Sequence, residues 1–452
     1  MITSKLKKML KLGICSAVAA TVLTFGAVSS TEAAVSEQLP TYKTVTTVYD
    51  WGPSINKLVV NLGVPVSPSE VNKNSFKVHV RRYLAEGTTT FAGHSSVVLG
   101  SQSQSPEDLE GDVNVIDVYT SDANGNRTDK RGSYVTIELP VSPTSTLTAA
   151  LNYDPVSGYN DWVDARYTIT ATQIGQIPSM TIDNKNGNIR PQADKFNYAT
   201  MKVANHQSYG YASYEPKDNA KHPLIVWLHG MGEGGTGSPS IAIMGNKAVE
   251  FAEDSIQHYF GGAYVLAPQA RTYWMHGYED FADGTSIYSD TLMELIRGYI
   301  KDHPNVDSNR VYVGGDSNGG YMTMLLIRDN PGFFAAAFPT CEGLADNMIT
   351  ETDLRNIAKT PTWFVAAKTD TVLPPNDYAV PTYNRLKGLG ANVHFSYFDN
   401  VLDDSGMYKK ADGSPYEYMG HWSWIYVYND KCEETVNGIT TKLFQWMANQ
   451  HR

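Results

Sequence analysis

The motif with the clearest chemical potential is Gly315-Asp316-Ser317-Asn318-Gly319, a G-x-S-x-G match. A strand-like run, RVYVGG, leads into it, and a helical run, GYMTMLLIRDN, leads out of it. A serine at the apex of a strand-to-helix turn needs small neighbours, which Gly315 and Gly319 supply. The helix that begins beneath the serine also favours negative charge developing nearby. The sequence therefore predicts that Ser317 is a nucleophile.

A serine nucleophile needs a general base, and the base needs an acid that orients it. On strand–turn–helix scaffolds of this kind, the three groups follow in the order serine, acid, histidine. Asp370 lies just past the strand-like run TWFVAAK, and catalytic groups collect at the carboxyl ends of strands in open α/β sheets. His421, in MGHWSW, follows a polar glycine-containing loop and precedes a helical run. We therefore expect Asp370 to be the acid and His421 the base.

Other acids and one other histidine compete for these roles. Asp377 is the second choice for the acid, and Asp399, Asp403 and Asp404 lie in a later loop from which they could substitute. His394, in ANVHFSYF, alternates into a strand, and we expect it to be structural.

An oxyanion needs two preorganised N–H donors. The run LIVWLHGMGEGG is a strand that enters a glycine-containing loop upstream of Ser317. We assign the donors to the backbone N–H groups of Met231, in this loop, and of Asn318, the residue after the nucleophile. Their side chains should matter less than their backbones. His229 is expected to make structural hydrogen bonds behind the loop.

The same loop contains a motif of a different kind. Gly230, Gly232 and Gly235 spell G-x-G-x-x-G, the dinucleotide fingerprint, but no acid ends a following strand. Glu250 and Glu253 stand at about the right distance and lie in a helical stretch, KAVEFAED. The downstream acid and histidine have no role in a dehydrogenase, so no nucleotide cofactor is expected.

Aromatic residues near the chemistry could line a substrate pocket. Trp274 and Trp422 are the candidates, with Tyr273 beside them, and ordinary core packing is the competing interpretation for each. No metal site is expected, because His222 and His229 lack partners at ligand spacing and no cysteine cluster exists.

The elements that must position these groups fall into two halves with different patterns. Short Val-, Ile-, Thr- and Tyr-rich runs separated by polar turns extend from about residue 42 to 172 and favour an immunoglobulin-like β-sandwich. After a Pro-, Gly- and Asn-containing linker at 175–194, buried strands alternate with helices, which indicates a mostly parallel sheet flanked by helices. We expect an all-β immunoglobulin-like domain over residues 36–180 and an α/β-hydrolase domain over 181–452.

The first 34 residues have the pattern of a secretory signal. Four lysines precede the apolar run ICSAVAATVLTFGAVSS, and small residues follow it. The uncharged stretch is short for a membrane anchor. A lipid anchor on Cys15 is also disfavoured, because Ile14 occupies the position of a small residue. We expect an exported, extracellular protein.

Two cysteines remain beyond that leader, Cys341 and Cys432. In an oxidising compartment they could form a disulfide, or they could stay as two separate buried thiols. The net charge of −11 argues against nucleic acid or an anionic membrane surface as a partner. The acidic turn TSDANGNRTDKRG is better explained by hairpin turn chemistry than by calcium binding, since its spacing matches no calcium loop.

Taken together, LHGMGEGG, GGDSNGG, AAKTD and GHWSW resemble the corresponding motifs of secreted bacterial carboxylesterases in which an immunoglobulin-like module precedes an α/β-hydrolase domain. These belong to the branch that includes polyhydroxybutyrate-depolymerase-like proteins and predicted peptidases. The resemblance implies a serine esterase without a cofactor, acting through Ser317, Asp370 and His421 on a small-molecule or polymeric ester. Asn318 departs from the Met or Gln often found after the serine.

Several functions remain open beside a short-chain carboxylesterase. The same three residues would serve a polymer-ester depolymerase, a feruloyl-type esterase or a serine peptidase, because specificity lies in loop shape. A non-catalytic surface-binding module is the alternative from a different class, and it would predict a broken triad. The oligomeric state is left open by the sequence.

Overall fold

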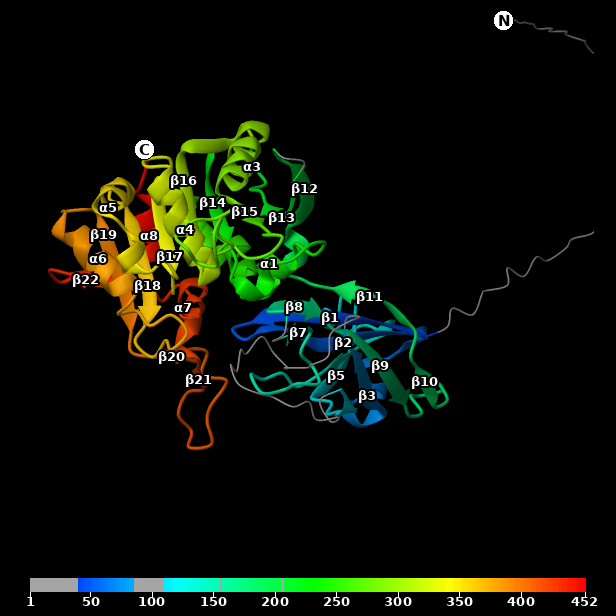
Figure 1. Cartoon of the computed structure of the whole chain (residues 1–452). Coiled ribbons are helices and arrows are strands. Elements are labelled where there is room, and N and C mark those ends of the chain that lie inside the picture. The colour runs from blue at the N-terminus through cyan, green and yellow to red at the C-terminus, as the bar shows by residue number, and fades with distance from the viewer. Residues whose placement is uncertain (1–39, 85–108, 155–156, 205–206) are drawn as a thin grey trace, which may run out of the picture. The chain divides into compact units, whose positions relative to one another are not determined.

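The computed structural model describes residues 40–84, 109–154, 157–204 and 207–452, and Figure 1 shows its ribbon. From Leu39 to Arg452 the chain forms one compact unit. The predicted signal at residues 1–34 lies outside the described residues. Within the described part of the chain, no helix has both the length and the apolar character that a bilayer span requires.

The N-terminal half consists of two β-sheets around a shared apolar core. One sheet has the order β11-β1-β2-β6-β5 and the other β10-β9-β3-β4, and a separate hairpin pairs β7 with β8. The strands are β1 (Thr41–Tyr49), β2 (Gly52–Val66), β3 (Phe76–Tyr83), β4 (Glu110–Val113), β5 (Asp117–Ser121), β6 (Gly132–Glu138), β7 (Leu151–Asp154), β8 (Tyr159–Trp162), β9 (Asp164–Ala171), β10 (Met180–Ile182) and β11 (Lys185–Ile189).

The residue pattern of β9 explains why this half forms a sandwich. Ala165, Tyr167, Ile169 and Ala171 are buried, while the residues between them are exposed. Successive side chains of a strand point to opposite faces, so one face of β9 enters the core and the other meets water. The buried face packs with residues of the other sheet, among them Leu58 of β2. The predicted β-sandwich is confirmed.

The acidic turn between β5 and β6 is built by turn chemistry. One carboxylate oxygen of Asp122 accepts the backbone N–H groups of Asn124 and Asn126, at 2.8 and 2.9 Å. The other accepts Nδ2 of Asn126 at 2.8 Å. Side-chain bonds of this kind to nearby backbone are typical of Asp in turns.

The C-terminal half is an eight-stranded sheet with the order β12-β13-β15-β14-β16-β17-β18-β19. The six strands from β15 to β19 run parallel, and β12 and β13 continue the sheet in antiparallel fashion. Its strands are β12 (Asn197–Lys202), β13 (Ser208–Tyr214), β14 (His222–Leu228), β15 (Tyr264–Pro268), β16 (Val306–Asp316), β17 (Ala336–Thr340), β18 (Thr362–Ala367) and β19 (Val393–Phe398).

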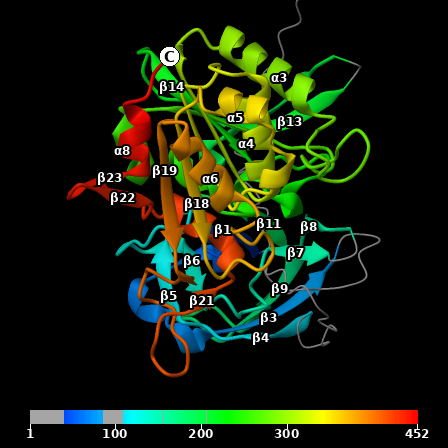
Figure 2. The same ribbon diagram turned by 60° about the vertical axis from the view of Figure 1, so that its left-hand side comes forward.

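Helices cover both faces of this sheet, and Figure 2 views it with α8 on one side and α4, α5 and α6 on the other. The helices are α1 (Ile241–Met244), α2 (Asp254–Gln257), α3 (Ser289–Asp302), α4 (Asn318–Asp329), α5 (Glu351–Ile357), α6 (Ala379–Gly388), α7 (Trp424–Tyr428) and α8 (Leu443–Ala448). Two small hairpins complete the chain, β20 (Val401–Leu402) with β21 (Glu417–Tyr418) and β22 (Glu433–Val436) with β23 (Ile439–Lys442).

Strand β14 shows how the sequence serves both faces. All seven of its residues are buried. Ile225 and Trp227 belong to the apolar cluster that includes α8, whereas Leu224, Val226 and Leu228 belong to the cluster that includes α3 and α4. A strand covered on both faces needs a continuous apolar run, as PLIVWL provides. The predicted α/β-hydrolase fold is confirmed.

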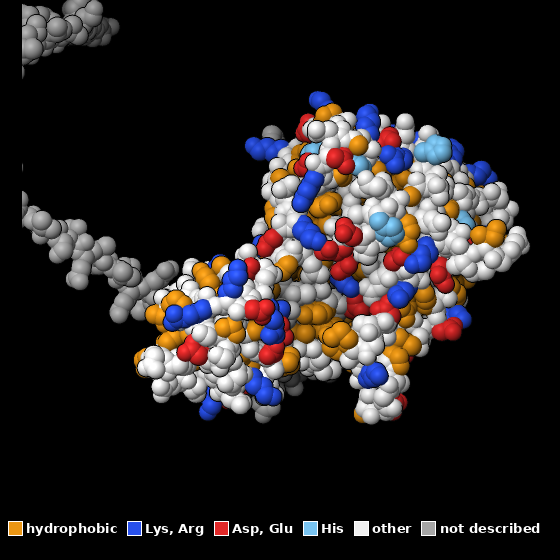
Figure 3. Space-filling view, turned by 180° about the vertical axis from the view of Figure 1, so that it is seen from behind, with side chains coloured by type: hydrophobic (Ala, Val, Ile, Leu, Met, Phe, Trp, Pro, Cys, Tyr) orange, Lys and Arg blue, Asp and Glu red, His pale blue; other side chains and the backbone are white. Residues whose placement is uncertain are grey.

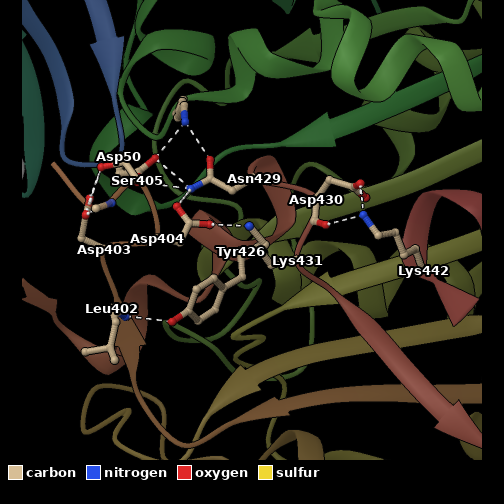
Figure 4. A network of polar contacts seen from close by, with 12 residues as sticks. Asp50, Leu402, Asp403, Asp404, Ser405, Tyr426, Asn429, Asp430, Lys431 and Lys442 are labelled. Carbon is tan, nitrogen blue, oxygen red and sulfur yellow. Dashed lines mark hydrogen bonds and ion pairs between the residues drawn. The ribbon is translucent and has the colours of Figure 1, made fainter. Parts of the chain in front are cut away.

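A polar network joins the β1–β2 turn to the C-terminal half, and Figure 4 shows the residues that meet there. Oδ1 of Asp50 accepts Nζ of Lys247 at 2.8 Å, and both carboxylate oxygens of Asp50 lie within 3.3 Å of Nδ2 of Asn429. Asn429 also donates to Asp404 at 3.0 Å.

On the face shown in Figure 3, Lys and Arg side chains of the described residues are interspersed with Asp and Glu.

Candidate active site

Ser317 occupies a sharp turn between β16 and α4. Its φ is +55° and its ψ −113°, which is unusual for a residue that is not glycine. Backbone conformations of this kind cost energy and collect at functional sites. A Cβ on Gly319 would collide with the carbonyl oxygen of Leu228, and one on Gly315 would lie 2.5 Å from the same atom. The two glycines therefore let the turn pack against the end of β14.

His421 and Asp370 meet Ser317 at the carboxyl edge of the sheet. Nε2 of His421 lies 2.9 Å from Oγ of Ser317, and Nδ1 lies 2.8 Å from Oδ2 of Asp370. The histidine is part of the short turn Gly420–Trp422, and Asp370 follows β18. The structure brings together the three residues that the sequence selected.

Backbone contacts hold the Asp370 carboxylate in place. Its second oxygen, Oδ1, accepts the N–H groups of Val372 and Leu373, each at 2.9 Å. A Cβ on Gly420 would collide with the backbone of Thr369, so the glycine lets the His421 turn approach the end of β18. With Oδ2 accepting the Nδ1 proton, the Nε2 lone pair faces Ser317, and the imidazole can take the proton of Oγ.

The competing residues lie elsewhere or have other partners. Asp399 pairs with Lys368 at 2.5 Å, and Asp403 accepts hydrogen bonds from Ser405 and from its own loop. His394 pairs with Glu434 and stacks on the ring of Trp363. Oδ1 of Asp404 accepts Nδ2 of Asn429 in the network of Figure 4, and the side chain of Asp377 is exposed.

The loop after β14 lies beside the Ser317 turn because Leu228 and Gly315 are in register. His229 fixes this loop: its Nδ1 lies 2.6 Å from the carbonyl oxygen of Gly230, and its Nε2 accepts the N–H of Ala270 at 2.9 Å. Burial lowers the pKa of His229 to about 4, so the imidazole is neutral. These contacts are of the structural kind that the sequence predicted.

The two proposed oxyanion donors each stand at the start of a helical turn. Met231 begins the turn Met231–Glu233, and Asn318 begins α4. The first N–H groups of a helix have no acceptor within it and remain available. The Asn318 side chain does more than expected, because its Oδ1 accepts the N–H of Met275 at 2.8 Å and so ties a neighbouring loop to the turn.

A cavity of about 150 Å³ opens at Ser317 and His421. Its apolar wall is made by Val372, Met419, Trp422 and Trp424, and its other lining residues are Tyr153, Asn160, Gly230, Met231, Gly232, Glu233, Asn246 and Asp316. The cavity can therefore take a small apolar group beside Ser317.

The two tryptophans offered as pocket candidates have different surroundings. Trp422 lines the cavity, whereas Trp274 is fully buried in the core, next to His229, Tyr209 and Tyr288. The next residue, Met275, donates its backbone N–H to Oδ1 of Asn318, which fixes the backbone beside Trp274.

The disulfide left open by the sequence is not formed, since Cys341 and Cys432 are both free and buried. Cys341 follows β17, near Asp370 and Ser423, whereas Cys432 precedes β22, near Asp430 and Ser396. The two thiols thus occupy different surroundings within the core, and each behaves as a small apolar side chain.

Several lining residues were missed from the sequence. Tyr153 and Asn160 belong to the β7–β8 hairpin of the N-terminal half, and no local signal marks them. Glu233 and Asp316 each stand two residues or fewer from an assigned residue, and the triad pattern gives neither of them a role. Among the described residues, no group of three or more His, Cys, Asp and Glu side chains could hold a metal ion.

Comparison with known proteins places both halves. Residues 41–179 match the family model of the esterase Ig-like N-terminal domain, and residues 276–386 match that of the prolyl oligopeptidase family. The crystal structure of a thermostable esterase matches with a TM-score of 0.70 at 22% identity, over 91% of this chain and 100% of that one. The fold resemblance that the sequence motifs predicted is confirmed.

A curated relative is the poly(3-hydroxybutyrate) depolymerase of Ralstonia pickettii, 31% identical over 134 residues. The match covers 28% of this chain and 26% of the relative, so the chain spans about a quarter of that protein's length.

Proposed function

We propose that this chain, in which an esterase-type immunoglobulin-like domain precedes an α/β-hydrolase domain, is a serine carboxylesterase acting through an acyl-enzyme. The observation that carries the proposal is the continuous contact from Ser317 through His421 to Asp370, with 2.9 Å between Oγ and Nε2 and 2.8 Å between Nδ1 and Oδ2. The two domains predicted at 36–180 and 181–452 are part of the same proposal, and because β10 and β11 pair with strands of the N-terminal half, we place the boundary after Ile189.

In the first half-reaction, Oγ of Ser317 attacks the ester carbonyl carbon while Nε2 of His421 takes the hydroxyl proton. The carbonyl oxygen becomes an oxyanion, which accepts hydrogen bonds from the N–H groups of Met231 and Asn318. Asp370 holds the imidazole tautomer and stabilises the imidazolium. When the C–O bond breaks, the imidazolium gives its proton to the leaving alkoxide, and an acyl-serine remains.

In the second half-reaction, water takes the place of the alcohol. His421 removes one proton from it as its oxygen attacks the acyl carbon, and a second tetrahedral oxyanion forms. Collapse expels Oγ, which regains its proton from His421, and a carboxylic acid is released. No cofactor enters either half, since proton transfer and oxyanion stabilisation come from the chain.

The proposed substrate is an ester with a short acyl group. The small cavity and its wall of Val372, Met419, Trp422 and Trp424 support this choice, because they offer a short acyl group an apolar place beside Ser317. A polymer ester is the second candidate, supported by the likeness over 134 residues to a protein named poly(3-hydroxybutyrate) depolymerase.

A panel of substrates tests this proposal. Purified protein is assayed with p-nitrophenyl acetate, butyrate, octanoate and palmitate, with 3-hydroxybutyrate oligomers, with methyl ferulate and with peptide anilides. We expect kcat/KM to be highest for acetate or butyrate and to fall with chain length. A higher kcat/KM for peptide anilides than for esters would show that the protein is a peptidase. If no substrate is turned over and a fluorophosphonate does not label the protein, a non-catalytic binding module would be favoured.

We also propose that the protein is exported, on the basis of the lysine-rich start and apolar run of residues 1–34. Expression of the full chain in a bacterium with a Sec pathway should release a protein whose N-terminus lies near residue 35. An intact leader on protein retained in the cytoplasm would contradict export.

A further inference from the structure

The β7–β8 hairpin of the N-terminal domain reaches the loop that carries Met231. A Cβ on Gly232 would lie 2.5 Å from Nδ2 of Asn160, so the hairpin packs directly on the turn Met231–Glu233. Trp162, at the end of the same hairpin, donates its Nε1 proton to Oγ of Ser238 at 2.8 Å. The N-terminal domain therefore touches the catalytic loop with specific polar contacts.

Asn160 of this hairpin contacts Glu233, and both residues line the cavity at Ser317. Its Nδ2 donates to Oε1 of Glu233 at 2.8 Å, across 73 residues of sequence. Asn160 is 3% exposed and Glu233 is 2% exposed. A hydrogen bond to a buried carboxyl is among the costlier ones to lose, because water cannot replace the missing donor.

The other carboxyl oxygen of Glu233 is linked through Asn246 to Asp316, the residue before Ser317. Nδ2 of Asn246 donates to Oε2 of Glu233 at 3.1 Å and to Oδ2 of Asp316 at 2.6 Å. A Cβ on Gly230 would lie 2.7 Å from Oδ2 of Asp316 and 3.0 Å from Oε2 of Glu233, so only a glycine leaves room for the two carboxyls.

These two carboxyls flank the two oxyanion donors. Glu233 is two residues after Met231, and Asp316 is two residues before Asn318. The chain of contacts Asn160–Glu233–Asn246–Asp316 thus links the segments that carry both N–H groups. Burial raises the pKa of Glu233 to about 7 and that of Asp316 well above its ordinary value, and the pair shares the few donors around it.

We propose that Asn160 is a positioning residue of the catalytic site, which holds Glu233 and thereby fixes the N–H of Met231 opposite Ser317. Through Asn160, the immunoglobulin-like domain would then help to position one of the two N–H donors of the oxyanion hole. The inference rests on the proposed esterase function, because it assigns a role within that reaction.

The test exchanges the two partners of the Asn160–Glu233 contact. Asn160→Asp removes the donor and places a second carboxyl next to that of Glu233. Asn160→Ala removes the donor without adding a charge. In the double variant N160D/E233Q, the new glutamine donates Nε2–H to the new aspartate and still accepts Nδ2 of Asn246 through Oε1. Asn126→Asp is the matched control, since Asn126 also donates Nδ2 to a carboxylate of the same domain, at an exposed turn.

The N–H donors stabilise the oxyanion in the transition state and not the bound ester. We therefore expect kcat for p-nitrophenyl butyrate to fall about 10- to 100-fold in N160D, with KM within about twofold of wild type. N160A should lose at least about fivefold in kcat, N160D/E233Q should recover to within about threefold of wild type, and N126D should match wild type. The Ki of a trifluoromethyl ketone, which forms a hemiketal oxyanion on serine, should rise in step with the loss of kcat.

Wild-type kcat in N160A, or a folded N160D/E233Q as slow as N160D, would overturn the positioning role. If N160D fails to fold, N160A and the exchange variant still decide. Ser317→Ala in the same assay separates the two levels: full activity there would refute the esterase mechanism itself, whereas inactive Ser317→Ala with unaffected Asn160 variants would refute only this inference.

Discussion

Oδ2 of Asp370 accepts from Nδ1 of His421 at 2.8 Å, although 51 residues separate them in sequence. The contact exists because the end of β18 and the turn Gly420–Trp422 meet at Gly420, where no side chain intervenes. The carboxylate is held from behind by the N–H groups of Val372 and Leu373. The proposed base, His421, is thus oriented by a carboxylate whose position is itself fixed by hydrogen bonds.

Asp370→Asn should lower kcat for a short-chain ester by about 10³- to 10⁴-fold while the protein stays folded. An amide in this place stabilises the wrong imidazole tautomer and no imidazolium. Asp377→Asn, which changes the second-choice acid in an exposed position, is the control and should keep wild-type kcat. Equal losses in both variants, or none in Asp370→Asn, would show that the acid is misassigned.

Gly319→Ala should destabilise the protein and remove its activity. Its new methyl group collides with the carbonyl oxygen of Leu228, which cannot move without disturbing β14. Overpacking of this kind costs about 1–3 kcal/mol or more. The free energy of unfolding is measured by urea denaturation. Gly388→Ala, at the end of α6 with open space around it, should be neutral or stabilising, and an unaltered Gly319→Ala protein would contradict the tight turn.

Glu342→Gln should change how stability depends on pH. Burial raises the pKa of Glu342 to about 8, and its Oε1 has no partner among the described residues. The folded state then holds this proton up to a higher pH than the unfolded state does, so the wild-type free energy of unfolding falls as pH rises from about 4.5 to about 8. Glutamine has no such proton to lose.

The free energy of unfolding of Glu342→Gln, relative to that of wild type, should therefore grow by about 1.4 kcal/mol per pH unit across that window, in which Glu342 is neutral in the folded state and ionised in the unfolded state. Urea denaturation at pH 5, 6, 7 and 8 measures it. Glu279→Gln, at an exposed position, provides the control and should run parallel to wild type. A constant difference between Glu342→Gln and wild type would show that Glu342 ionises normally in the folded protein.

Cys341 and Cys432 should react as two free thiols once the chain is unfolded. With a protein that begins at residue 35, a thiol reagent in denaturant and without reductant should titrate two groups, and almost none in the native state. Burial raises the pKa of both thiols, which keeps them protonated and slow to react. No titratable thiol in denaturant would mean that a disulfide forms, against the structure.

Much of the fold and of the site could be predicted, because the relevant signals are local. The alternation of ARYTITA and the continuous apolar run PLIVWL indicate whether one or both faces of each strand are covered. Gly315 and Gly319 indicate a turn with no room for side chains. The order serine, acid, histidine then restricted the partners to very few residues.

The rest depends on contacts between distant segments. The sequence offers both Trp274 and Trp422 as pocket residues, and only the packing of Trp274 against Tyr209 and Tyr288 distinguishes the core residue from the pocket residue. Asn160 lies in a different domain from Glu233, so nothing near either residue indicates their contact. A disulfide also depends on distance and direction, which two cysteines in a sequence do not specify.

The most direct test of the proposed chemistry is kcat of Ser317→Ala for p-nitrophenyl butyrate, measured beside wild type on protein of equal thermal stability. The mechanism predicts a fall of about 10⁴-fold or more. It also predicts that a fluorophosphonate adds its mass to the wild-type peptide containing Ser317 and not to the variant. Turnover in Ser317→Ala at the wild-type rate would contradict the proposal that this serine is the nucleophile.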